Sequence, residues 1–196
     1  MSKTTKILRT LVVVGVVGSI AALGVFSAFS SQTDNPGNEV KAGTVTLADN
    51  DSGSAAYNIQ NAKPGDSDQA CIKVTYSGSL DSTVKLYTTA SSVADLGPHV
   101  NLEITPGTQV TPNLDCTGFV ADLSGAIFDD TLASFQSSHN AFGNGLADNP
   151  GSVASKWTTN DSVVYRVKAT LAANAPDSAQ GDTTGVHTIR WEAQNQ

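Results

Sequence analysis

Alternating apolar and polar residues recur along most of the chain and predict β-strands. The clearest run is 161–171, where one face carries only apolar side chains: Val163, Tyr165, Val167, Ala169 and Leu171. The same period of two marks further predicted strands at 40–47, 55–62, 69–76, 83–89, 99–105 and 184–193. The strands 69–76 and 83–89 lie close enough in sequence to predict a hairpin. Residues 126–136 are the one candidate helix.

Turn residues separate these runs. Lys63-Pro64-Gly65-Asp66 predicts a tight turn, because Pro presets φ at one corner and Gly accepts positive φ at the next. Pro106-Gly107 is expected to end the strand 99–105. Short strands with turns between them are typical of an antiparallel sandwich, so the sequence predicts an all-β fold with one short helix.

The N-terminal stretch has a different pattern, that of an export signal. Lys3, Lys6 and Arg9 precede an uncharged stretch, 10–33, whose part 11–29 is mostly apolar. The small residues Val25 and Ser27 predict cleavage between Ser27 and Ala28, which makes 1–27 a signal peptide that forms an N-terminal helix. Cleavage after Ala28 or Ser31 is an alternative. The apolar run is also long enough to span a bilayer, so an uncleaved anchor is the main alternative.

Charge narrows the range of partners. Removal of the signal leaves 8 basic against 18 acidic residues, a formal charge of −10. Such a surface argues against nucleic acid and anionic lipid as partners. Contact with a membrane is expected only through an uncleaved signal.

The chain has two cysteines, Cys71 and Cys116. In an exported protein they predict one structural disulfide, with two buried free thiols as the alternative. In the chain-entropy model a bridge over this separation contributes about 4 kcal/mol to the free energy of unfolding.

Several motifs together resemble the TasA/camelysin (CalY) family of secreted bacterial proteins. They are Ala28-Phe29, Ala42-Gly43-Thr44-Val45-Thr46-Leu47, Asn61-Ala62-Lys63-Pro64-Gly65-Asp66, Val74-Thr75-Tyr76-Ser77-Gly78-Ser79-Leu80 and Thr188-Ile189-Arg190-Trp191-Glu192-Ala193-Gln194. The resemblance implies an antiparallel jelly-roll β-sandwich, released by a SipW-type signal peptidase, that polymerises into extracellular biofilm-matrix fibres. It also implies donor-strand complementation, in which the N-terminal segment of one subunit pairs with the next.

Carried onto this chain, the resemblance divides it into a signal, 1–27, an N-terminal donor extension, 28–38, and a jelly-roll domain, 39–196. The donor segment would consist of Ala28, Phe29, Ser30, Ser31, Gln32 and Thr33, with Phe29 as its apolar anchor. Pro36 cannot donate to a strand ladder, so the donor is expected to be short or to bend there.

Candidate catalytic and metal-binding residues are few. His99, His139 and His187 are far apart in sequence and none lies in an H-E-x-x-H motif. Asp49-x-Asp51-x-Gly53 has a faint calcium-loop pattern but lacks the distal Glu, which favours a polar turn. Asp129-Asp130 is interpreted as a pair at a helix N-terminus. The sequence therefore predicts no catalytic residue, no metal site and no cofactor.

Three functions remain as hypotheses. The first is a secreted structural protein of the cell surface or extracellular matrix, whose partners are other copies of itself, the SipW-type signal peptidase and an accessory or anchor protein. The second is a camelysin-like zinc metalloendopeptidase, which rests on family analogy alone. The third is a monomeric surface adhesin, in which Trp157 or Trp191 stacks on sugars. The strand position of Trp191 favours core packing for that residue.

Overall fold

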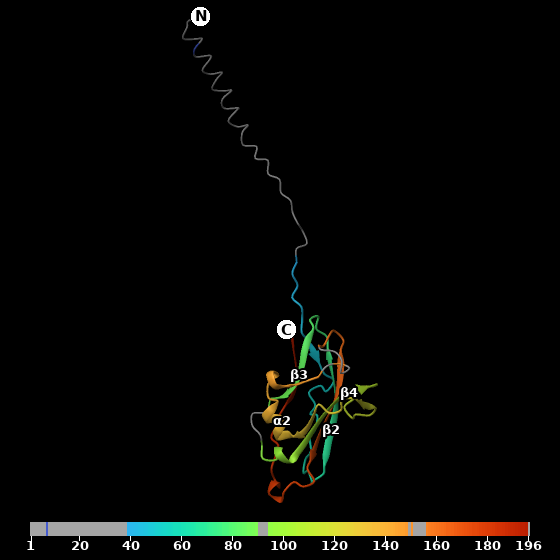
Figure 1. Cartoon of the computed structure of the whole chain (residues 1–196), viewed down its shortest axis with the longest axis vertical. Coiled ribbons are helices and arrows are strands. Elements are labelled where there is room, and N and C mark those ends of the chain that lie inside the picture. Colours follow the sequence, from blue (N-terminus) through green and yellow to red (C-terminus); the bar gives the residue numbers. More distant parts are fainter. Residues whose placement is uncertain (1–6, 8–38, 90–93, 149, 151–155, 196) are drawn as a thin grey trace. The chain divides into compact units, whose positions relative to one another are not determined.

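The computed structural model describes residues 7, 39–89, 94–148, 150 and 156–195 (Figure 1). Residue contacts separate the chain into two units, Met1–Lys41 and Ala42–Gln196. The fold described below is that of the second unit. Among the residues that the structure describes, no helix is long and apolar enough to cross a bilayer. Apart from Ile7, the predicted signal segment 1–27 and the whole of the donor extension 28–38 fall outside the described residues.

The larger sheet contains six strands, all paired antiparallel. Five follow the order β1 (Leu47–Ala48), β2 (Ser67–Tyr76), β8 (Ser162–Leu171), β4 (Val100–Gln109) and β5 (Phe119–Ala121). The sixth, β6 (Phe128–Thr131), pairs with the first part of β4, next to β5. Strand β8 is therefore central, and β1 lies at one margin of the sheet.

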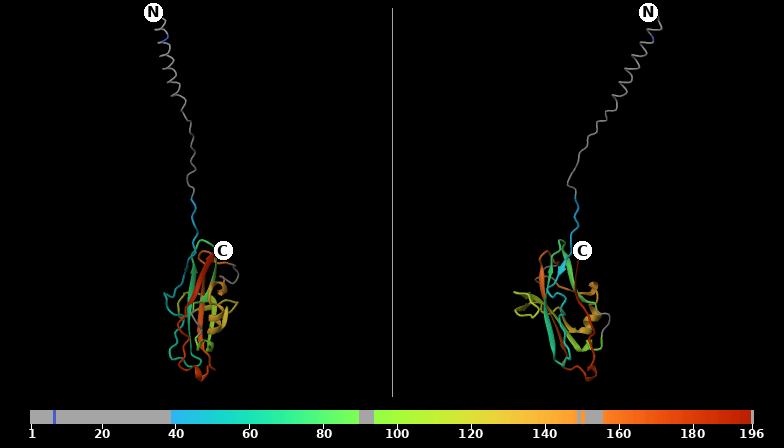
Figure 2. Two further views of the ribbon diagram at one scale, coloured as in Figure 1. Left: turned by 90° about the vertical axis from the view of Figure 1, so that its left-hand side faces the viewer. Right: turned by 180° about the vertical axis from the view of Figure 1, so that it is seen from behind.

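The smaller sheet has three strands in the order β7 (Leu146–Ala147), β3 (Ser82–Thr88) and β9 (Ile189–Asn195). Strand β9 begins five residues later than the predicted strand 184–193, because only Ile189 onward is in register with β3. The C-terminal end of β9 lies at the same end of the domain as the segment that leads into β1 (Figures 1 and 2).

The core lies between the inward faces of the two sheets. The predicted alternation is confirmed in β2, where Ile72, Val74 and Tyr76 are buried. It is also confirmed in β8, whose buried inward residues are Val163, Tyr165, Val167, Ala169 and Leu171. Trp157 is completely buried, and its indole N–H donates to the carbonyl of Asp148 at 2.8 Å. Together the two antiparallel sheets and this single core confirm the all-β sandwich.

The helix is shorter than predicted. Helix α2 (Leu132–Ser138) begins after Thr131, whose hydroxyl accepts from the N–H of Ser134 at 3.1 Å. Residues Phe128–Thr131 form β6 instead, because the open side of β4 offers them backbone partners. Asp129 and Asp130 therefore lie in a strand, and the helix N-terminal interpretation of this pair is wrong. Short 3-10 helices occur at Gly97–His99 (η1), Phe142–Asn144 (η2) and Asp177–Ala179 (η4).

The predicted hairpin between 69–76 and 83–89 is wrong. Strand β2 belongs to the larger sheet and β3 to the smaller one, so residues 77–81 carry the chain from one layer to the other. The hydroxyl of Tyr76 donates to the Leu80 carbonyl and lies 2.8 Å from Ser82 Oγ, which fixes this crossing. Two strands that each have one apolar face bury both faces when they stack, and a flat hairpin cannot do this.

Two predicted strands near the N-terminus are also corrected. Of 40–47, only Leu47 belongs to a strand, as the first residue of β1, and Val40 is 99% exposed. The carbonyls of Thr44 and Thr46 accept from the N–H groups of Ser79 and Ser77, so this segment follows the chain after β2 without forming a regular strand. Residues 55–62 form no strand, since Asn61 adopts a positive φ of 53°. Tyr57 still packs against the core from this irregular segment.

Pro106-Gly107 does not end β4, which runs on to Gln109. Pro106 lies between the residues of β4 that pair with β6, Asn101–Ile104, and those that pair with β5, Gly107–Gln109. Its carbonyl accepts from Asp122 N–H at 3.0 Å, so its missing N–H faces that same side, between the two partner strands. By contrast, the turn predicted at Lys63–Asp66 is confirmed: Gly65 has a φ of 93°, and Asp66 N–H donates to the Lys63 carbonyl at 2.9 Å.

Candidate functional site

The outer edge of β9 forms one margin of the smaller sheet. Strand β9 pairs with β3 on one side and, among the described strands, with none on the other. In an antiparallel pair, the N–H and C=O of one residue point to the same side, and this side alternates along the strand. The alternation in β3 therefore shows which residues of β9 face outward.

Two contacts fix that alternation. Ser82 exchanges backbone hydrogen bonds with Trp157, and Thr88 N–H donates to the His139 carbonyl, so both residues point away from β9. Thr89 N–H donates to Thr188 instead, toward the β9 side. The β3 residues that bond to β9 are thus the odd-numbered ones, and by the register their partners are Arg190, Glu192 and Gln194.

The N–H and C=O groups of Ile189, Trp191 and Ala193 consequently point outward from β9. We call these groups the free edge of β9. Within the described part of the chain they have no backbone partner. An extended peptide could pair with them as an additional strand.

The side chains of the same three residues turn inward and give this edge an apolar inner face. All three pack against the core but are only partly buried. The Trp191 ring lies against Tyr165, with ring centroids 5.5 Å apart. The edge therefore combines unpaired backbone groups with apolar side chains, as an acceptor for an additional strand requires.

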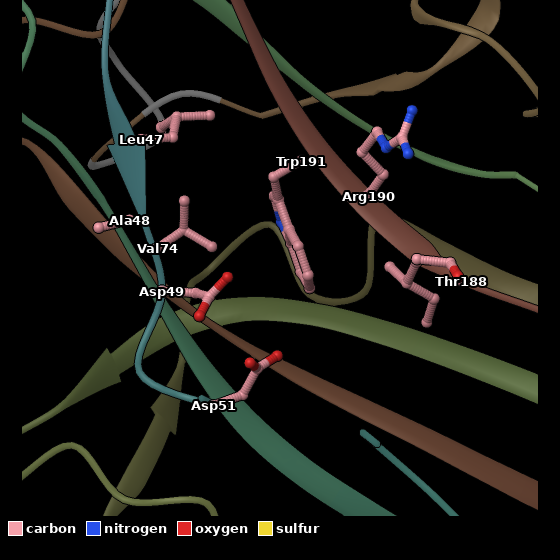
Figure 3. Close-up of a pocket in the computed structure, with 9 residues that line it drawn as sticks. Leu47, Ala48, Asp49, Asp51, Val74, Thr188, Arg190 and Trp191 are labelled. Carbon is pink, nitrogen blue, oxygen red and sulfur yellow. The ribbon is translucent and has the colours of Figure 1, made fainter. Parts of the chain in front are cut away.

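A pocket of about 240 Å³ lies beside the free edge, between the start of β9 and the segment around β1 (Figure 3). Its lining consists of Leu47, Ala48, Asp49, Asp51, Val74, Thr188, Ile189, Arg190 and Trp191. We call it the β9 pocket. It is about large enough for one side chain, because sites for drug-sized ligands start near 300 Å³. The buried indole N–H of Trp191 has no hydrogen-bond partner among the described residues.

Two carboxylates stand at one side of the β9 pocket. Asp49 and Asp51 follow β1 directly, in a turn that is tied to β2 by the hydrogen bond from Lys73 N–H to Asn50 Oδ1, 2.8 Å long. Asp51 also accepts from Gly53 N–H at 2.6 Å. Partial burial and the neighbouring Asp51 carboxylate raise the pKa of Asp49. The pair is thus a site where a cation would relieve like-charge repulsion.

A second contact holds the irregular segment 49–62 to the approach to β9. Tyr57 Oη hydrogen-bonds with His187 Nε2, and His187 Nδ1 lies 3.1 Å from the Gly185 carbonyl. Since a carbonyl only accepts, His187 donates from Nδ1 and accepts at Nε2 from the tyrosine hydroxyl. Burial raises the pKa of Tyr57, which keeps this hydroxyl protonated as a donor. The contact ties Tyr57 to the residue that precedes Thr188, which lines the β9 pocket.

Comparison with protein families shows to which family the chain belongs. The model of the family described as camelysin metallo-endopeptidase matches residues 4–140. The chain belongs to this family. No curated protein matches the chain. Membership confirms the resemblance that the sequence motifs indicated and associates the chain with proteins of the cell surface or secretion.

The family description implies a metal, which needs ligands from the chain. Among the described residues, no three His, Cys, Asp or Glu side chains are grouped as a metal ion would require. Both ring nitrogens of His187 are engaged as above, and His139 Nδ1 lies 2.6 Å from the Asn144 carbonyl. The described residues therefore do not fit a zinc site, and we derive no step through a metal.

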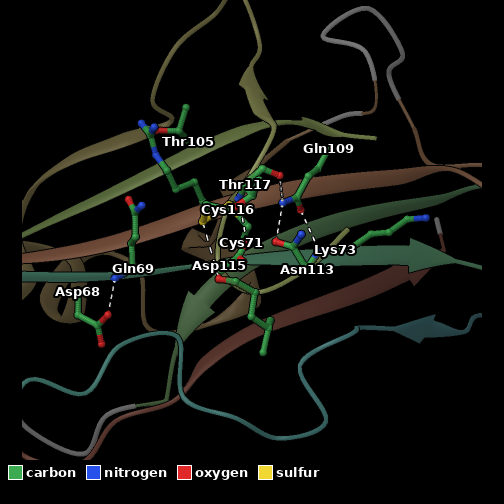
Figure 4. The surroundings of a disulfide bond; sticks show 12 residues. Asp68, Gln69, Cys71, Lys73, Thr105, Gln109, Asn113, Asp115, Cys116 and Thr117 are labelled. Carbon is green, nitrogen blue, oxygen red and sulfur yellow. Dashed lines mark hydrogen bonds between the residues drawn. A yellow bond between two sulfur atoms is a disulfide. The ribbon is translucent and has the colours of Figure 1, made fainter. Parts of the chain in front are cut away.

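The structure places the predicted disulfide on the outer face of the larger sheet (Figure 4). Cys71 in β2 and Cys116 are bonded, with Cα atoms 5.0 Å apart. Residues 110–118 leave β4, cross β8 and reach the far side of β2, where Cys71 N–H donates to the Leu114 carbonyl at 3.1 Å. Gln109 supports this crossing through hydrogen bonds to Asn113 and Thr117. We call residues 110–118 the strap.

The other predicted site residues have different outcomes. The cleavage pair Ser27 and Ala28 and the donor segment Ala28–Thr33 lie outside the described residues and stay predictions. Trp191, expected in the core, packs against the core while only partly buried, and it also lines the β9 pocket. The sequence marked Asp49 and Asp51 only as a polar turn, because their position opposite β9 depends on the packing of two sheets.

Proposed function

We propose that this camelysin-family protein is a secreted structural subunit that assembles into extracellular fibres of the cell surface or biofilm matrix. Residues Ala28–Thr33 of one subunit add to the free edge of β9 in the next. The observation that carries the proposal is this free edge, where three successive outward-facing backbone positions lie above an apolar inner face. At this edge, backbone groups that face outward and partly buried core residues lie together.

The mature chain has the length that such an exchange needs. Residues 28–38 form an eleven-residue extension ahead of the described domain. Fully extended, eleven residues span at most about 36–40 Å, which is enough to reach a neighbouring subunit. Removal of the signal would free this extension, so cleavage between Ser27 and Ala28 acts as the switch that permits assembly.

Electron microscopy of the chain 28–196 tests the proposal. We expect filaments from the mature chain and none from a chain that lacks Ala28–Thr33. The acceptor is tested by Ala193→Pro, because the N–H of Ala193 faces outward and its loss removes no bond to β3. This variant should stay folded but form no filaments.

Gln194→Pro is the matched control for folding. Gln194 bonds to Thr83, so this substitution should lower thermal stability, whereas Ala193→Pro should not. A mature chain that stays monomeric at high concentration would overturn the proposal. Filaments that persist in Ala193→Pro would show that the acceptor lies elsewhere.

A zinc metalloendopeptidase is the second candidate, and the family description favours it. Its test is direct: the purified mature chain is assayed for stoichiometric zinc and for casein cleavage that a chelator abolishes. Both results together would establish the enzyme, and the fibre test is independent of them.

A further inference from the structure

The β9 pocket has two carboxylates on one side, and strand addition does not require them. Backbone pairing along the free edge would be the same whether or not the signal peptide is still attached to the donor segment. Asp49 and Asp51 nevertheless place two carboxylates in the lining of the β9 pocket, together with Thr188 and Ile189 at the start of β9. Figure 3 shows Asp49 beside Ala48 and Val74, with Asp51 below it, across the pocket from Thr188 and Arg190.

We propose that these two carboxylates recognise the α-ammonium group of Ala28 that signal cleavage creates on a neighbouring subunit. The inference rests on the proposed function and names what its acceptor selects: a processed N-terminus. The occupant is thus the segment Ala28–Thr33 of a second copy, with its first residue at Asp49 and Asp51.

Charge complementarity supports this assignment. The two acidic groups lie in one turn, and their mutual repulsion is part of what raises the pKa of Asp49. A cation placed between them removes that repulsion and gains charge-assisted hydrogen bonds. The donor segment itself has no charged side chain, so the α-ammonium is the only cation that Ala28–Thr33 can bring.

The pocket accounts for the second donor residue. With Ala28 at the carboxylates, Phe29 follows one residue along the free edge, beside Val74, Ile189 and Trp191, which line the pocket. The unpartnered indole N–H of Trp191 can donate to a carbonyl of the donor. An aromatic side chain fills a pocket of about 240 Å³ that is otherwise open.

This placement fixes the direction of the donor strand. Its N-terminus lies at the Ile189 end of β9, and its remaining residues continue toward Ala193, so it runs parallel to β9. The six donor residues then cover the outward positions Ile189, Trp191 and Ala193 in turn. An uncleaved precursor has a peptide bond at Ala28 in place of the ammonium and is not recognised.

The test compares fibre assembly by the full mature chain with a free Ala28 amine and by the same chain enzymatically acetylated at Ala28. We expect acetylation to raise the critical concentration about tenfold, since one charge-assisted contact is worth roughly that factor. In the double variant Asp49→Asn/Asp51→Asn, acetylation should change the critical concentration less than twofold. The charge-matched control Asp95→Asn/Asp182→Asn should keep the tenfold effect.

The outcomes separate this inference from the proposed function. Equal critical concentrations for the free and acetylated chains would overturn recognition of the N-terminus and leave fibre assembly intact. An acetylation effect that survives in Asp49→Asn/Asp51→Asn would also overturn it. Absence of fibres from both chains would overturn the proposed function and this inference together. Thermal unfolding of each variant verifies that the subunit is folded.

Discussion

Among single residues, Glu103 and Arg166 show how partial burial determines the contribution of an ion pair to stability. Arg166 Nη2 lies 2.6 Å from Glu103 Oε1, on the outer face of the larger sheet, and the side chains of Arg166 and Glu103 are 30% and 27% exposed. Thr105 Oγ1 donates to the same oxygen at 2.9 Å. Partial burial would raise the pKa of Glu103, but the hydrogen bonds from Thr105 and Arg166 and the charges of Arg166 and Lys168 outweigh it and lower that pKa.

We predict that Glu103→Gln lowers the free energy of unfolding at pH 7 by about 1 kcal/mol, the range of a partly screened ion pair. Because the pKa of Glu103 is lower in the folded than in the unfolded protein, the stabilisation is complete above the unfolded pKa. It is lost as pH falls through the folded pKa. Urea unfolding of both proteins from pH 7 to pH 3 measures this difference.

Glu39→Gln is the matched control. Glu39 pairs with Lys41 at 3.1 Å, but these side chains are 65% and 79% exposed, so the variant should leave stability unchanged. An undiminished difference between Glu103→Gln and the parent at pH 3 would contradict the assignment.

Among elements, the hairpin of β4 and β5 depends on one close approach. A side chain at Gly107 would overlap the carbonyl of Val120 and the ring of Phe119. Phe119 in turn lies beneath the Arg166 guanidinium, 5.3 Å from the ring centroid. The absence of a Cβ at Gly107 therefore lets β5 lie against β4 and positions the end of the strap.

Gly107→Ala should displace β5 and lower the free energy of unfolding by about 1–3 kcal/mol, the usual cost of overpacking. Gly143→Ala serves as the control, because a Cβ there meets nothing within 4 Å. Hydrogen exchange of the Val120 amide should rise in Gly107→Ala and stay unchanged in Gly143→Ala. Equal stability of the two variants would show that β5 accommodates the methyl group.

At the scale of the whole molecule, the disulfide ties the strap to a strand that is not a neighbour of β4 or β5. The Cys71–Cys116 bond links β2 to the excursion between β4 and β5, with β8 between them. One covalent bond thus spans three strands of the larger sheet and closes a loop between residues 45 apart. Val164, on the outer face of β8, is buried.

Cys71→Ala/Cys116→Ala should lower the free energy of unfolding by about 2–4 kcal/mol, mainly because the unfolded chain gains freedom. Denaturant unfolding, with and without reductant, measures the loss. Since the strap lies on the outer face and the β9 pocket beside the other sheet, assembly of the folded variant should persist at low temperature. Unchanged stability under reductant would contradict this account of the bond.

The sequence by itself determined what depends on neighbouring residues. The alternation in 69–76 and 161–171 fixed two long strands and their buried faces, because a strand repeats every two residues. The turn at Gly65 followed from local φ preferences. The family followed from motifs between Ala28 and Gln194, and the family model matches residues 4–140.

Tertiary structure alone decided which strand lies in which sheet. Residues 69–76 and 83–89 read as a hairpin, yet stacking their apolar faces buries more surface than pairing their edges. Asp49 and Asp51 lie within a few residues of β1, but only the packing of the two sheets brings them beside Trp191 and the free edge of β9. An edge is defined by the strand that is missing next to it, and no local pattern in a sequence records that absence.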